Sequence, residues 1–399
     1  MPNSSWLQKT SPAFRLMIAT SWLAPASWQD HQEEAIREAT GANVDWTEYI
    51  GLVDRHRTPA LSWAALKRVP GLKVPDPATK ELQKRSEACR MQGLKHSMLL
   101  AEVLRALNKA GIPAMSLKGP ILSFDLYGDV GLRQSKDLDL EIPLERFSQA
   151  TNCLAELGWH LHSDQHPLTP RQWKSCLKHE HHIAFVNSSG STLELHWRCY
   201  WDAPGKPSTR WARSSPSLWQ GCTRQVMHPI DLVLYLSSHG TEHYWFRAKW
   251  LGDMARIHTI GLADWRAALD QARATDQSRS LLASLLLLKE VHGLALPYQP
   301  KEDWRDVPPF LVENSLKALC SAERQSTSPV IILKNLLPSI RNAKLAKPQI
   351  TWREIFASLA YRRADFDLLH LPDSLYWAYT PLRPVLWLWR MVRRRRLAR

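Results

Sequence analysis

The 399-residue sequence predicts an α+β protein, with a small mixed β-sheet core flanked by helical N- and C-terminal regions. Two observations lead to this fold class. In the second quarter of the chain, helical and strand-like segments alternate and then give way to two adjacent strand-like segments, which is typical of a small mixed sheet covered by helices. On either side, apolar residues recur at helical spacing. The length and the 44% hydrophobic content allow a full core and a division into two or three units.

The same patterns divide the chain into four regions. We expect a helical N-terminal region over residues 1–95, the mixed core over 96–200, a helical domain over 201–300 and a helical C-terminal region with a basic tail over 301–399. Within the first region, the stretch "RVPGLKVPDP" carries three prolines and a glycine, so a helix break is expected there.

The core region begins with a helix and a strand. In "KHSMLLAEVLRALNKAG", leucine and valine residues repeat at helical spacing, and Gly111 supplies a stop. "IPAMSL" then reads as a short strand, and "GPILSFDLYG" as a turn that enters a helix. The next strand is expected at about 136–142, within "LRQSKDLDLEI", because acidic and apolar residues alternate there.

The second half of the core is predicted to end in a hairpin. Pro143 opens a helix that Gly158 closes, and "WHLH" follows as a short strand. "HHIAFV" and "STLELHW" are strand-like and are joined by the turn-rich "NSSG". Because His181 and His182 are adjacent, we expect them on opposite faces of their strand. Downstream, "PIDLVLYLSSHG", "AKWLGDMARIH" and "RSLLASLLLLKEVHG" predict a helical chain.

The strand at 136–142 carries a row of acids. Successive strand residues point to opposite faces, so Asp137, Asp139 and Glu141 share one face, and the apolar residues between them take the core. Neighbouring acids in this row stand only about 7 Å apart and repel one another unless a cation lies among them. Taken alone, the row is equally compatible with the solvent-exposed face of an edge strand.

Magnesium suits such a row of carboxylates. It takes oxygen ligands from carboxylates and substrate phosphates, and two ions about 4 Å apart can clamp the attacking and leaving oxygens of a phosphoryl transfer. Glu194, in "STLELHW", supplies a further carboxylate from a separate strand. Asp137, Asp139 and Glu194 are therefore the candidate catalytic and metal-binding residues.

The residues that precede the acidic strand suit a chain of phosphates. In "SLKGP", Gly119 permits close backbone approach at the start of a helix, and a helix N-terminus attracts phosphate oxygens. Arg133 and Ser135 offer a cation and a hydroxyl to a triphosphate. With Lys118, these are candidate nucleotide-binding residues.

The combination of "LKG", "LYGDVGLRQSKDLDLEI", "HHIAFV", "LELHW" and "WFRAKWLGDMARI" resembles the uncharacterised nucleotidyltransferase family of the polymerase-beta-like superfamily. The resemblance covers roughly residues 45–260. It implies a nucleotidyltransferase core that uses two Mg²⁺ ions to transfer a nucleoside monophosphate from an NTP, such as ATP, to an acceptor hydroxyl or amine, with release of pyrophosphate. The sequence does not specify the acceptor, for which a small molecule, a peptide, a protein and RNA all stay open.

The family's pattern can be carried over onto this chain. The resemblance implies that Asp137 and Asp139 bind both metal ions, and that Glu194 completes one metal site and helps to activate the acceptor. Gly119 stands for the first glycine of the family's glycine pair. The second position is Pro120, which has no N–H to offer, so part of the phosphate-binding role is expected of the cationic and hydroxyl side chains named above.

Two charged positions lie outside this motif. Glu141 is interpreted as a bystander. Lys249, in "HYWFRAKWLGDMARI", is a further candidate for contact with phosphate, as is Arg256, and Asp253 would orient one of them. The alternative is a surface helix in which Lys249 pairs with Asp253 four residues later.

Two other functions stay open. Cys176 with His179, and His196 with Cys199, are spaced as zinc ligands and flank the predicted hairpin, which would suit a zinc-binding protein. The other is a non-catalytic nucleotidyltransferase fold that acts as a binding or scaffold module and docks through its basic C-terminal tail. The presence of all three acids favours the enzyme, because a degenerate module has more often lost one of them.

The chain is strongly basic. Its formal net charge of +14 predicts attraction to polyanions, whether nucleotides, nucleic acid or an anionic membrane surface. Six arginines in the C-terminal "RMVRRRRLAR" form either a solvated end or a peripheral contact with membrane or nucleic acid. Six cysteines without a C-x-x-C pair favour reduced thiols and therefore a cytoplasmic protein, with any membrane contact at its periphery.

Overall fold

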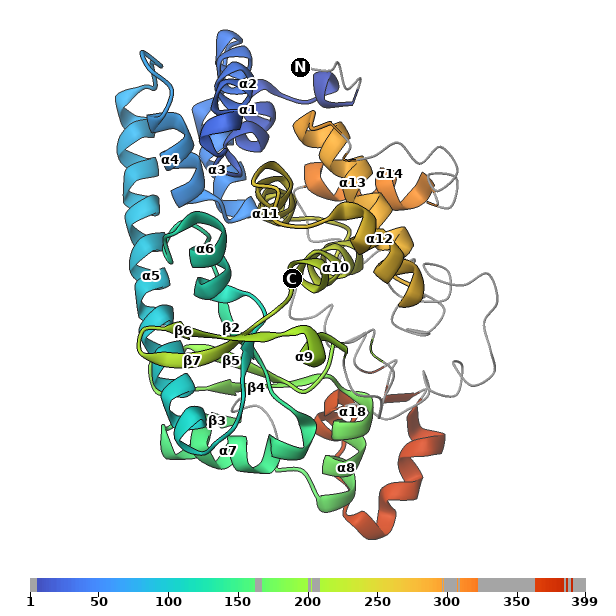
Figure 1. Ribbon diagram of the computed structural model, residues 1–399. Helices are drawn as coiled ribbons and strands as arrows, with labels where there is room; N and C mark the ends of the chain where they lie inside the picture. Colours follow the sequence, from blue (N-terminus) through green and yellow to red (C-terminus); the bar gives the residue numbers. More distant parts are fainter. Residues whose placement is uncertain are drawn as a thin grey trace.

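The computed structural model describes residues 6–161, 167–199, 202, 209–295, 297, 307, 309–321, 363–383, 385–386 and 389 (Figure 1). Its centre is a seven-stranded sheet with the strand order β3-β4-β5-β2-β1-β7-β6. The strands are β1 (Met115–Ser116), β2 (Asp137–Glu141), β3 (His160–Leu161), β4 (His182–Val186), β5 (Thr192–His196), β6 (Ser215–Trp219) and β7 (Cys222–Val226). Helical regions precede and follow the sheet, so the predicted α+β class is confirmed.

The sheet is mixed, and β2 lies at its centre. β2 runs parallel to β5 on one side and antiparallel to β1 on the other. β1 runs parallel to β7, whereas β3–β4, β4–β5 and β6–β7 are antiparallel pairs. Because β2 has a partner along both edges, its backbone is held in register and its side chains point either above or below the sheet.

Helices build the rest of the molecule. Those before the sheet are α1 (Pro12–Thr20), α2 (Gln29–Gly41), α3 (Trp46–His56), α4 (Pro59–Lys67) and α5 (Asp76–Lys109). Those between strands are α6 (Gly119–Tyr127), η3 (Leu144–Arg146), α7 (Phe147–Glu156), α8 (Pro170–His179) and α9 (Thr209–Arg213). Those after the sheet are α10 (Pro229–Glu242), α11 (Ala248–Thr259), α12 (Trp265–Ala274), α13 (Ser278–His292), α14 (Pro309–Cys320), α18 (Arg363–Leu368) and η5 (Asp373–Ala378).

Helix α5 joins two hydrophobic cores. It has 34 residues and runs along one whole side of the molecule (Figure 1). Leu82 and Cys89 belong to a large core shared with helices of the N-terminal region and with α10–α13. Leu100 and Leu104 belong to a second core beneath the sheet. The predicted boundary between residues 95 and 96 therefore falls inside a continuous helix, and the two regions share that element.

The second core occupies one face of the sheet. Leu138 and Leu140 of β2 and Leu193 and Leu195 of β5 are fully buried there, in the same cluster as residues of α5 and α7. These residues alternate with the acids, as the spacing predicts. Burial of the leucine face fixes the register of β2, because a slip by one residue would carry the acids into the core.

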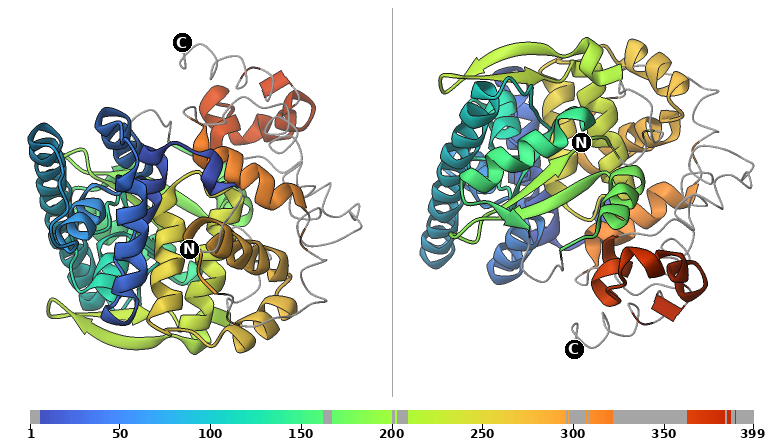
Figure 2. Two further views of the ribbon diagram at one scale, coloured as in Figure 1. Left: turned by 90° about the horizontal axis from the view of Figure 1, so that it is seen from above. Right: turned by 90° about the horizontal axis from the view of Figure 1, so that it is seen from below.

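The C-terminal segment lies far from α5. In views from above and from below, the described residues between 363 and 389 lie on the opposite side of the molecule from that helix (Figure 2). Phe366 and Tyr379 of this segment are buried in a third, smaller core together with Cys176 of α8. The segment is therefore anchored on the helix that precedes the β4–β5 hairpin.

The elements predicted around the acidic strand are confirmed. The proline-rich break lies between α4 and α5, the hairpin is β4–β5, and the helices expected after the sheet are α10, α11 and α13. The prediction that the chain is helical after residue 200 is wrong over 215–226, where β6 and β7 form a second hairpin and extend the sheet past the expected core.

The second hairpin has a recognisable turn. Gln220 and Gly221 adopt positive φ angles of 48° and 73°, as a two-residue hairpin turn requires. Pro216 argued against a strand in the sequence, because proline is tolerated only on edge strands. β6 is such an edge strand. The polar residues of β7 likewise lack the apolar alternation of an ordinary strand.

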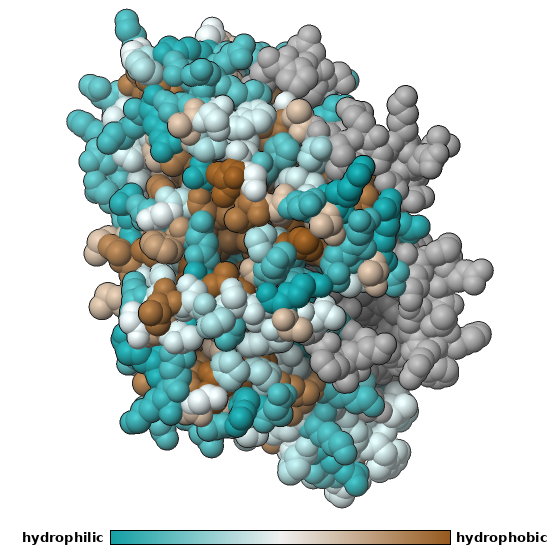
Figure 3. Space-filling view, in the orientation of Figure 1, coloured by the Kyte–Doolittle hydropathy of each residue, from teal (hydrophilic) through white to brown (hydrophobic). Residues whose placement is uncertain are grey.

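On the face shown in Figure 3, hydrophobic residues gather mainly near the middle, and the upper and lower parts are largely hydrophilic. Among the described residues, no helix is both long and apolar enough to cross a membrane. The arginine-rich tail predicted to contact membrane or nucleic acid lies outside the described residues, so that contact stays a prediction.

Candidate active site

The pairing of β2 with β5 brings acids from two distant segments together. In this parallel pair, Asp139 stands directly opposite Glu194, and Asp137 stands opposite Thr192. Directly opposed residues point to the same face of a sheet, and so do residues two apart on one strand. Asp137, Asp139 and Glu194 therefore share the face opposite the leucine core.

Asp139 lies at the centre of this face. Its Oδ1 lies 3.3 Å from Nζ of Lys118 and 3.5 Å from Nε2 of His196. Burial opposes its ionisation, but Lys118 and then His196 outweigh burial and hold the pKa of Asp139 below its usual value. Within the described part of the chain, this buried oxygen accepts no hydrogen bond. It is a charged oxygen beside two cationic groups, which suits a cation ligand.

Lys118 is positioned by the start of α6. It is the N-cap residue of that helix, and its Nζ lies 5.8 Å from the ring centroid of Tyr235 in α10. Burial disfavours its charge, but the Asp139 carboxylate raises the pKa of Lys118 above the usual value. A fixed positive charge therefore stands between the acids and α10.

Glu194 contacts two histidines. Its Oε2 lies 3.4 Å from Nε2 of His196 and 3.8 Å from Nε2 of His182. Burial alone would raise the pKa of Glu194, but contact with His196 gives a net lowering. Burial disfavours protonation of His196, yet its contacts with Asp139 and Glu194 raise its pKa. The imidazolium of His196 thus lies between two carboxylates, where a bridging cation would bind.

Asp137 differs from its neighbour Asp139. It is half-buried, and burial together with the negative charges of Asp139 and Glu194 raises its pKa. A carboxyl whose ionisation is opposed by nearby carboxylates is stabilised in its charged form when a cation binds among them. The three acids offer hard oxygen ligands, as magnesium requires, so the residues present fit a divalent ion.

Glu141, the third acid of the row, is tied up inside the protein. It is fully buried, accepts hydrogen bonds from Arg210 at 3.1 and 3.2 Å, and accepts one from Nε1 of Trp211 at 2.9 Å. Arg210 also contacts Asp202 at 2.8 Å. At Glu141, the cation expected among the acids is therefore the guanidinium of Arg210.

The loop between α6 and β2 is packed tightly on α5. A Cβ on Gly93 of α5 would lie 2.5 Å from the carbonyl oxygen of Val130, and one on Gly131 would lie 2.8 Å from Cα of Arg90. Ser123 of α6 accepts a hydrogen bond from the backbone N–H of Arg133 at 2.9 Å. Close backbone contact at these two glycines thus fixes the position of the loop that leads to Asp137.

Gly119 adopts a conformation that favours glycine. Its φ is 73°, in the left-handed region, and a Cβ there would lie 3.6 Å from the carbonyl oxygen of Asp137. Pro120 occupies the first turn of α6, where a helix leaves its N–H groups unpaired in any case. The start of α6 therefore lies directly against the first residue of the acidic strand.

Two other predicted phosphate ligands bind within the protein. Nε of Arg133 donates to both carboxylate oxygens of Asp253 in α11, at 2.8 and 2.9 Å. Nζ of Lys249 donates to the carbonyl oxygen of Gln134 at 2.7 Å. Burial and repulsion from Arg133 lower the pKa of Lys249 well below the usual value. Asp253, considered as the partner of Lys249, is instead the partner of Arg133.

Ser135 is buried as well and is hydrogen-bonded to Nδ1 of His96 in α5, at 3.1 Å. Together, the contacts of Arg133, Ser135 and Lys249 hold the loop before β2 between α5 and α11. Of the five predicted nucleotide-binding residues, Lys118 and Gly119 directly adjoin the acids. Phosphate contact by the other three stays a prediction.

Sequence reasoning missed a set of rings beside the site, which we call the aromatic row: Tyr235 and His239 of α10, its C-cap residue His243, and Trp250 of α11. The rings of Tyr235 and His239 are parallel, with centroids 6.2 Å apart. The ring centroid of Trp250 lies 5.0 Å from that of His239 and 5.5 Å from that of the exposed His243. The row leads from Lys118 outward. Rings at every fourth residue of a helix were its signal in the sequence.

The zinc alternative predicted from cysteine and histidine spacing is wrong. Cys176 lies in the third core, and Cys199 lies in the large core. In the segments that the structure describes, no cluster of potential metal ligands contains a cysteine or His179. The reason is that β5 carries His196 to the acidic face, whereas α8 turns Cys176 toward the C-terminal segment.

Residues 42–293 match the protein family described as "Uncharacterised nucleotidyltransferase". The chain belongs to this family. No curated protein matches the chain. A solved structure of the antibiotic-resistance factor ANT(2″)-Ia is 14% identical, with a TM-score of 0.34, and the match covers 47% of this chain and 93% of that one.

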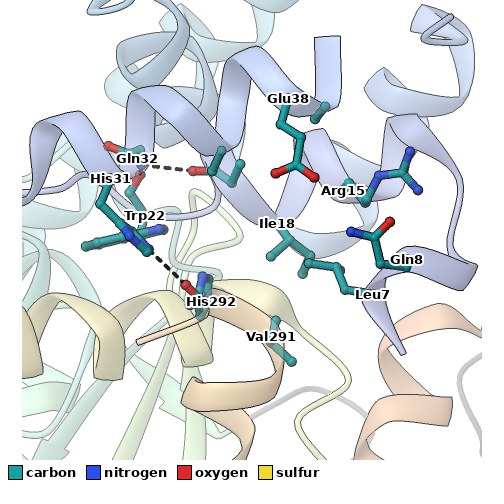
Figure 4. A pocket seen from close by; sticks show the side chains of 13 residues that line it. Leu7, Gln8, Arg15, Ile18, Trp22, His31, Gln32, Glu38, Val291 and His292 are labelled. Carbon is teal, nitrogen blue, oxygen red and sulfur yellow. Dashed lines mark hydrogen bonds between the residues drawn. The ribbon is translucent and has the colours of Figure 1, made fainter. Parts of the chain in front are cut away.

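This member of the nucleotidyltransferase family also has a pocket away from the acids, between α1, α2 and α13 (Figure 4). It encloses about 570 Å³, including space open to solvent. His31 and Gln32 line it, and their polar atoms bind backbone groups, including the carbonyl oxygen of His292 at 3.1 Å. These contacts join α2 to α13 and α1.

Proposed function

We propose that this protein is a magnesium-dependent enzyme that transfers a nucleoside monophosphate from an NTP to an acceptor hydroxyl or amine. The observation that carries the proposal is the direct pairing of Asp139 with Glu194 on adjacent parallel strands, with Asp137 two residues away on the same face. Membership of the nucleotidyltransferase family supports it. So does the cationic start of α6, where Lys118 contacts Asp139.

Each acid has a proposed role. Asp137 and Asp139 hold two magnesium ions between them, and Glu194 completes one of the two sites. Bound there, the ions neutralise charge on the attacking and leaving oxygens of the transfer. Asp137 in particular is stabilised as a carboxylate by such binding, because its pKa is raised by burial and by the two neighbouring acids.

The transfer has a simple balance of bonds. The acceptor oxygen or nitrogen forms a bond to the α-phosphorus of the NTP, while the bond from that phosphorus to the bridging oxygen breaks and pyrophosphate leaves. The acceptor's proton passes to a base. Glu194 suits this role, because its carboxylate is more exposed than that of Asp139.

The surroundings of the acids suggest which substrate lies on which side. Lys118, the start of α6 and the aromatic row lie on one side, and we assign the NTP to it. A cation suits the phosphates, and an aromatic ring stacks on any nucleobase. Glu194 with His182 lies toward β4, and we assign the acceptor to that side. Arg133, Ser135 and Lys249 would reach phosphate only by exchanging their present partners.

The test is turnover of labelled NTPs by wild-type protein and by Glu194→Gln. Each NTP is incubated with the protein, Mg²⁺ and a host lysate, and mass spectrometry identifies the species that gains a nucleotide. Loss of that product with Glu194→Gln supports the proposal. Glu145→Gln, at an exposed acid outside the site, is the matched control and should keep full turnover.

Two results would contradict this assignment. Equal turnover by wild type and Glu194→Gln would remove the two-metal mechanism. Binding of NTP without transfer to any lysate component, and without release of pyrophosphate, would favour the non-catalytic scaffold instead. The mass of the modified component would also identify the acceptor class, which the site chemistry leaves open among small molecule, peptide, protein and RNA.

A further inference from the structure

Three histidine side chains meet beside the acids. His181, His182 and His196 each place a ring nitrogen within 4.8 Å of the others'. The ring centroids of His182 and His196 lie 4.8 Å apart, and those of His181 and His182 lie 4.4 Å apart. The expectation that His181 and His182 point to opposite faces is wrong, because His181 precedes the first residue of β4 and is free of the strand's alternation.

Strand pairing fixes two of these rings. His182 stands directly opposite His196 in the antiparallel pair β4–β5, so both point to the face that carries Glu194. His196 is 8% exposed at its side chain, and the side chain of His182 is 30% exposed. His196 is therefore the buried side of the cluster, and His182 is the side nearer to solvent.

Among the described residues, two ring nitrogens of this cluster lack a hydrogen bond, and Nε2 of His196 becomes a metal ligand when an ion displaces its proton. Nδ1 of His182 and Nε2 of His196 are buried and make no hydrogen bond within the described part of the chain. A buried polar atom without a hydrogen bond is costly, which calls for a partner that the protein alone does not supply.

A fourth ligand lies next to the three rings. Oε2 of Glu194 is 3.8 Å from Nε2 of His182 and 3.4 Å from Nε2 of His196. Imidazole nitrogen suits zinc, copper, iron and nickel, whereas magnesium takes oxygen. Three histidines and one carboxylate thus differ in kind from the aspartate pair on β2.

We propose that His181, His182 and His196, with Glu194, form a binding site for one transition-metal ion of the zinc class. This site lies on the β4–β5 side of the acids and shares Glu194 with the proposed magnesium site. The three ring nitrogens already lie within 4.8 Å of one another, and Oε2 of Glu194 lies within 3.8 Å of a ring nitrogen of His182 and of His196. Because Glu194 and His196 also adjoin Asp139, an ion here would fix both side chains relative to the acidic strand.

The inference is tested by metal binding without NTP, so the result does not depend on the proposed transfer activity. Metal-free protein, prepared without an affinity histidine tag, is titrated with Co²⁺ and followed by visible absorption. Zn²⁺ binding is measured by equilibrium dialysis with elemental analysis. We expect one ion per chain. We expect the double variant His181→Ala with His182→Ala to bind at least roughly 100-fold more weakly, because two of four ligands are lost.

Three controls sharpen the test. His160→Ala removes an exposed histidine of β3 and should leave binding unchanged. Asp137→Asn should also keep zinc-class binding while it abolishes turnover, which separates failure of this inference from failure of the proposed function. His182→Gln serves if the double variant does not fold, as judged by circular dichroism. Absence of binding by wild type, or equal binding by the histidine variants and wild type, would overturn the inference.

Discussion

Two acids of β2, its middle residue Asp139 and its last residue Glu141, carry the same chemistry and use it differently. Asp139 and Glu141 are both buried acids on the same face of the same strand, two residues apart. Glu141 is neutralised by Arg210 and hydrogen-bonded by Trp211. Asp139 has an oxygen that accepts no hydrogen bond in the described part of the chain, beside Lys118. In this row of alternating acids, Glu141 thus forms a structural ion pair and Asp139 is a candidate metal ligand. The two acids differ in the groups that contact them.

The strongest test of this contrast is Asp139→Asn. If Asp139 is the catalytic one of the two acids, loss of this charge should lower NTP turnover roughly 10³-fold, the scale for removal of one electrostatic stabiliser of a transition state. The thermal midpoint should also fall, because Lys118 and His196 lose the buried carboxylate that they contact, so turnover is expressed per folded molecule. Turnover is measured by pyrophosphate release. Activity within a few-fold of wild type would remove Asp139 from the site.

The opposite pattern is expected for Glu141→Gln. Removal of its charge takes one of two carboxylate partners from the buried Arg210 and leaves Asp202 beside it, so the free energy of unfolding should fall by about 3 kcal/mol. Turnover per folded molecule should be retained. Denaturant unfolding measures the loss, and Glu145→Gln, at an exposed acid, should change stability by less than about 0.5 kcal/mol. A stable but inactive Glu141→Gln would reverse the roles of the two acids.

The pKa values of two buried histidines, His196 and His292, show a similar contrast. His196 has a raised pKa because carboxylates contact it, whereas burial, with repulsion from His31, lowers the pKa of His292 to about 3. In the unfolded chain the His292 ring binds a proton near pH 6.5, whereas in the folded protein it stays neutral at that pH. The free energy of unfolding is therefore highest above pH 6.5 and falls as the pH falls. From pH 7 to pH 5 this residue should cost about 2 kcal/mol.

The histidine prediction is checked by urea unfolding of wild type and His292→Gln at both pH values. The variant should lose less stability than wild type on acidification, by about the same 2 kcal/mol. His31→Gln, which removes the repelling neighbour, should change the slope much less, because burial is the larger cause of the lowered pKa. Identical pH slopes for wild type and His292→Gln would show that this ring does not titrate as described.

The smallest expected effect concerns the aromatic row, which lies at the Asp139 end and not at the Glu141 end. Trp250→Ala should raise KM for the NTP roughly tenfold with little change in kcat, the scale of one lost stacking contact. Trp377→Ala, at a ring that is 67% exposed on η5, is the matched control and should leave both constants unchanged. A change confined to kcat would place Trp250 outside the nucleotide-binding surface.

The sequence allowed the central sheet and the acidic face to be predicted for a physical reason. The leucines that alternate with Asp137 and Asp139 must be buried, and burial on one face forces the acids onto the other. The convergence of Glu194 could only be hypothesised, because parallel pairing of β2 with β5 depends on the whole sheet. The geometry now agrees with that hypothesis, while the catalytic roles stay predictions.

Partners were less predictable than positions. Nothing near Glu141 in the sequence points to Arg210, 69 residues away, or near Arg133 to Asp253, 120 residues away. Such pairs form only when elements pack. The zinc prediction failed for the same reason, since spacing within a segment does not show which core a cysteine enters. The β6–β7 hairpin was missed because an edge strand tolerates proline and polar residues.

Helix α5 has a consequence for any attempt to divide the protein. At about 1.5 Å per residue it extends roughly 50 Å, and Leu82 and Leu104 anchor its two halves in different cores. A fragment that starts at residue 96 would begin in mid-helix and expose the apolar surfaces that the missing half covers. We therefore expect the excised sheet to aggregate, so genetic dissection of this protein has to proceed by point substitution in the intact chain.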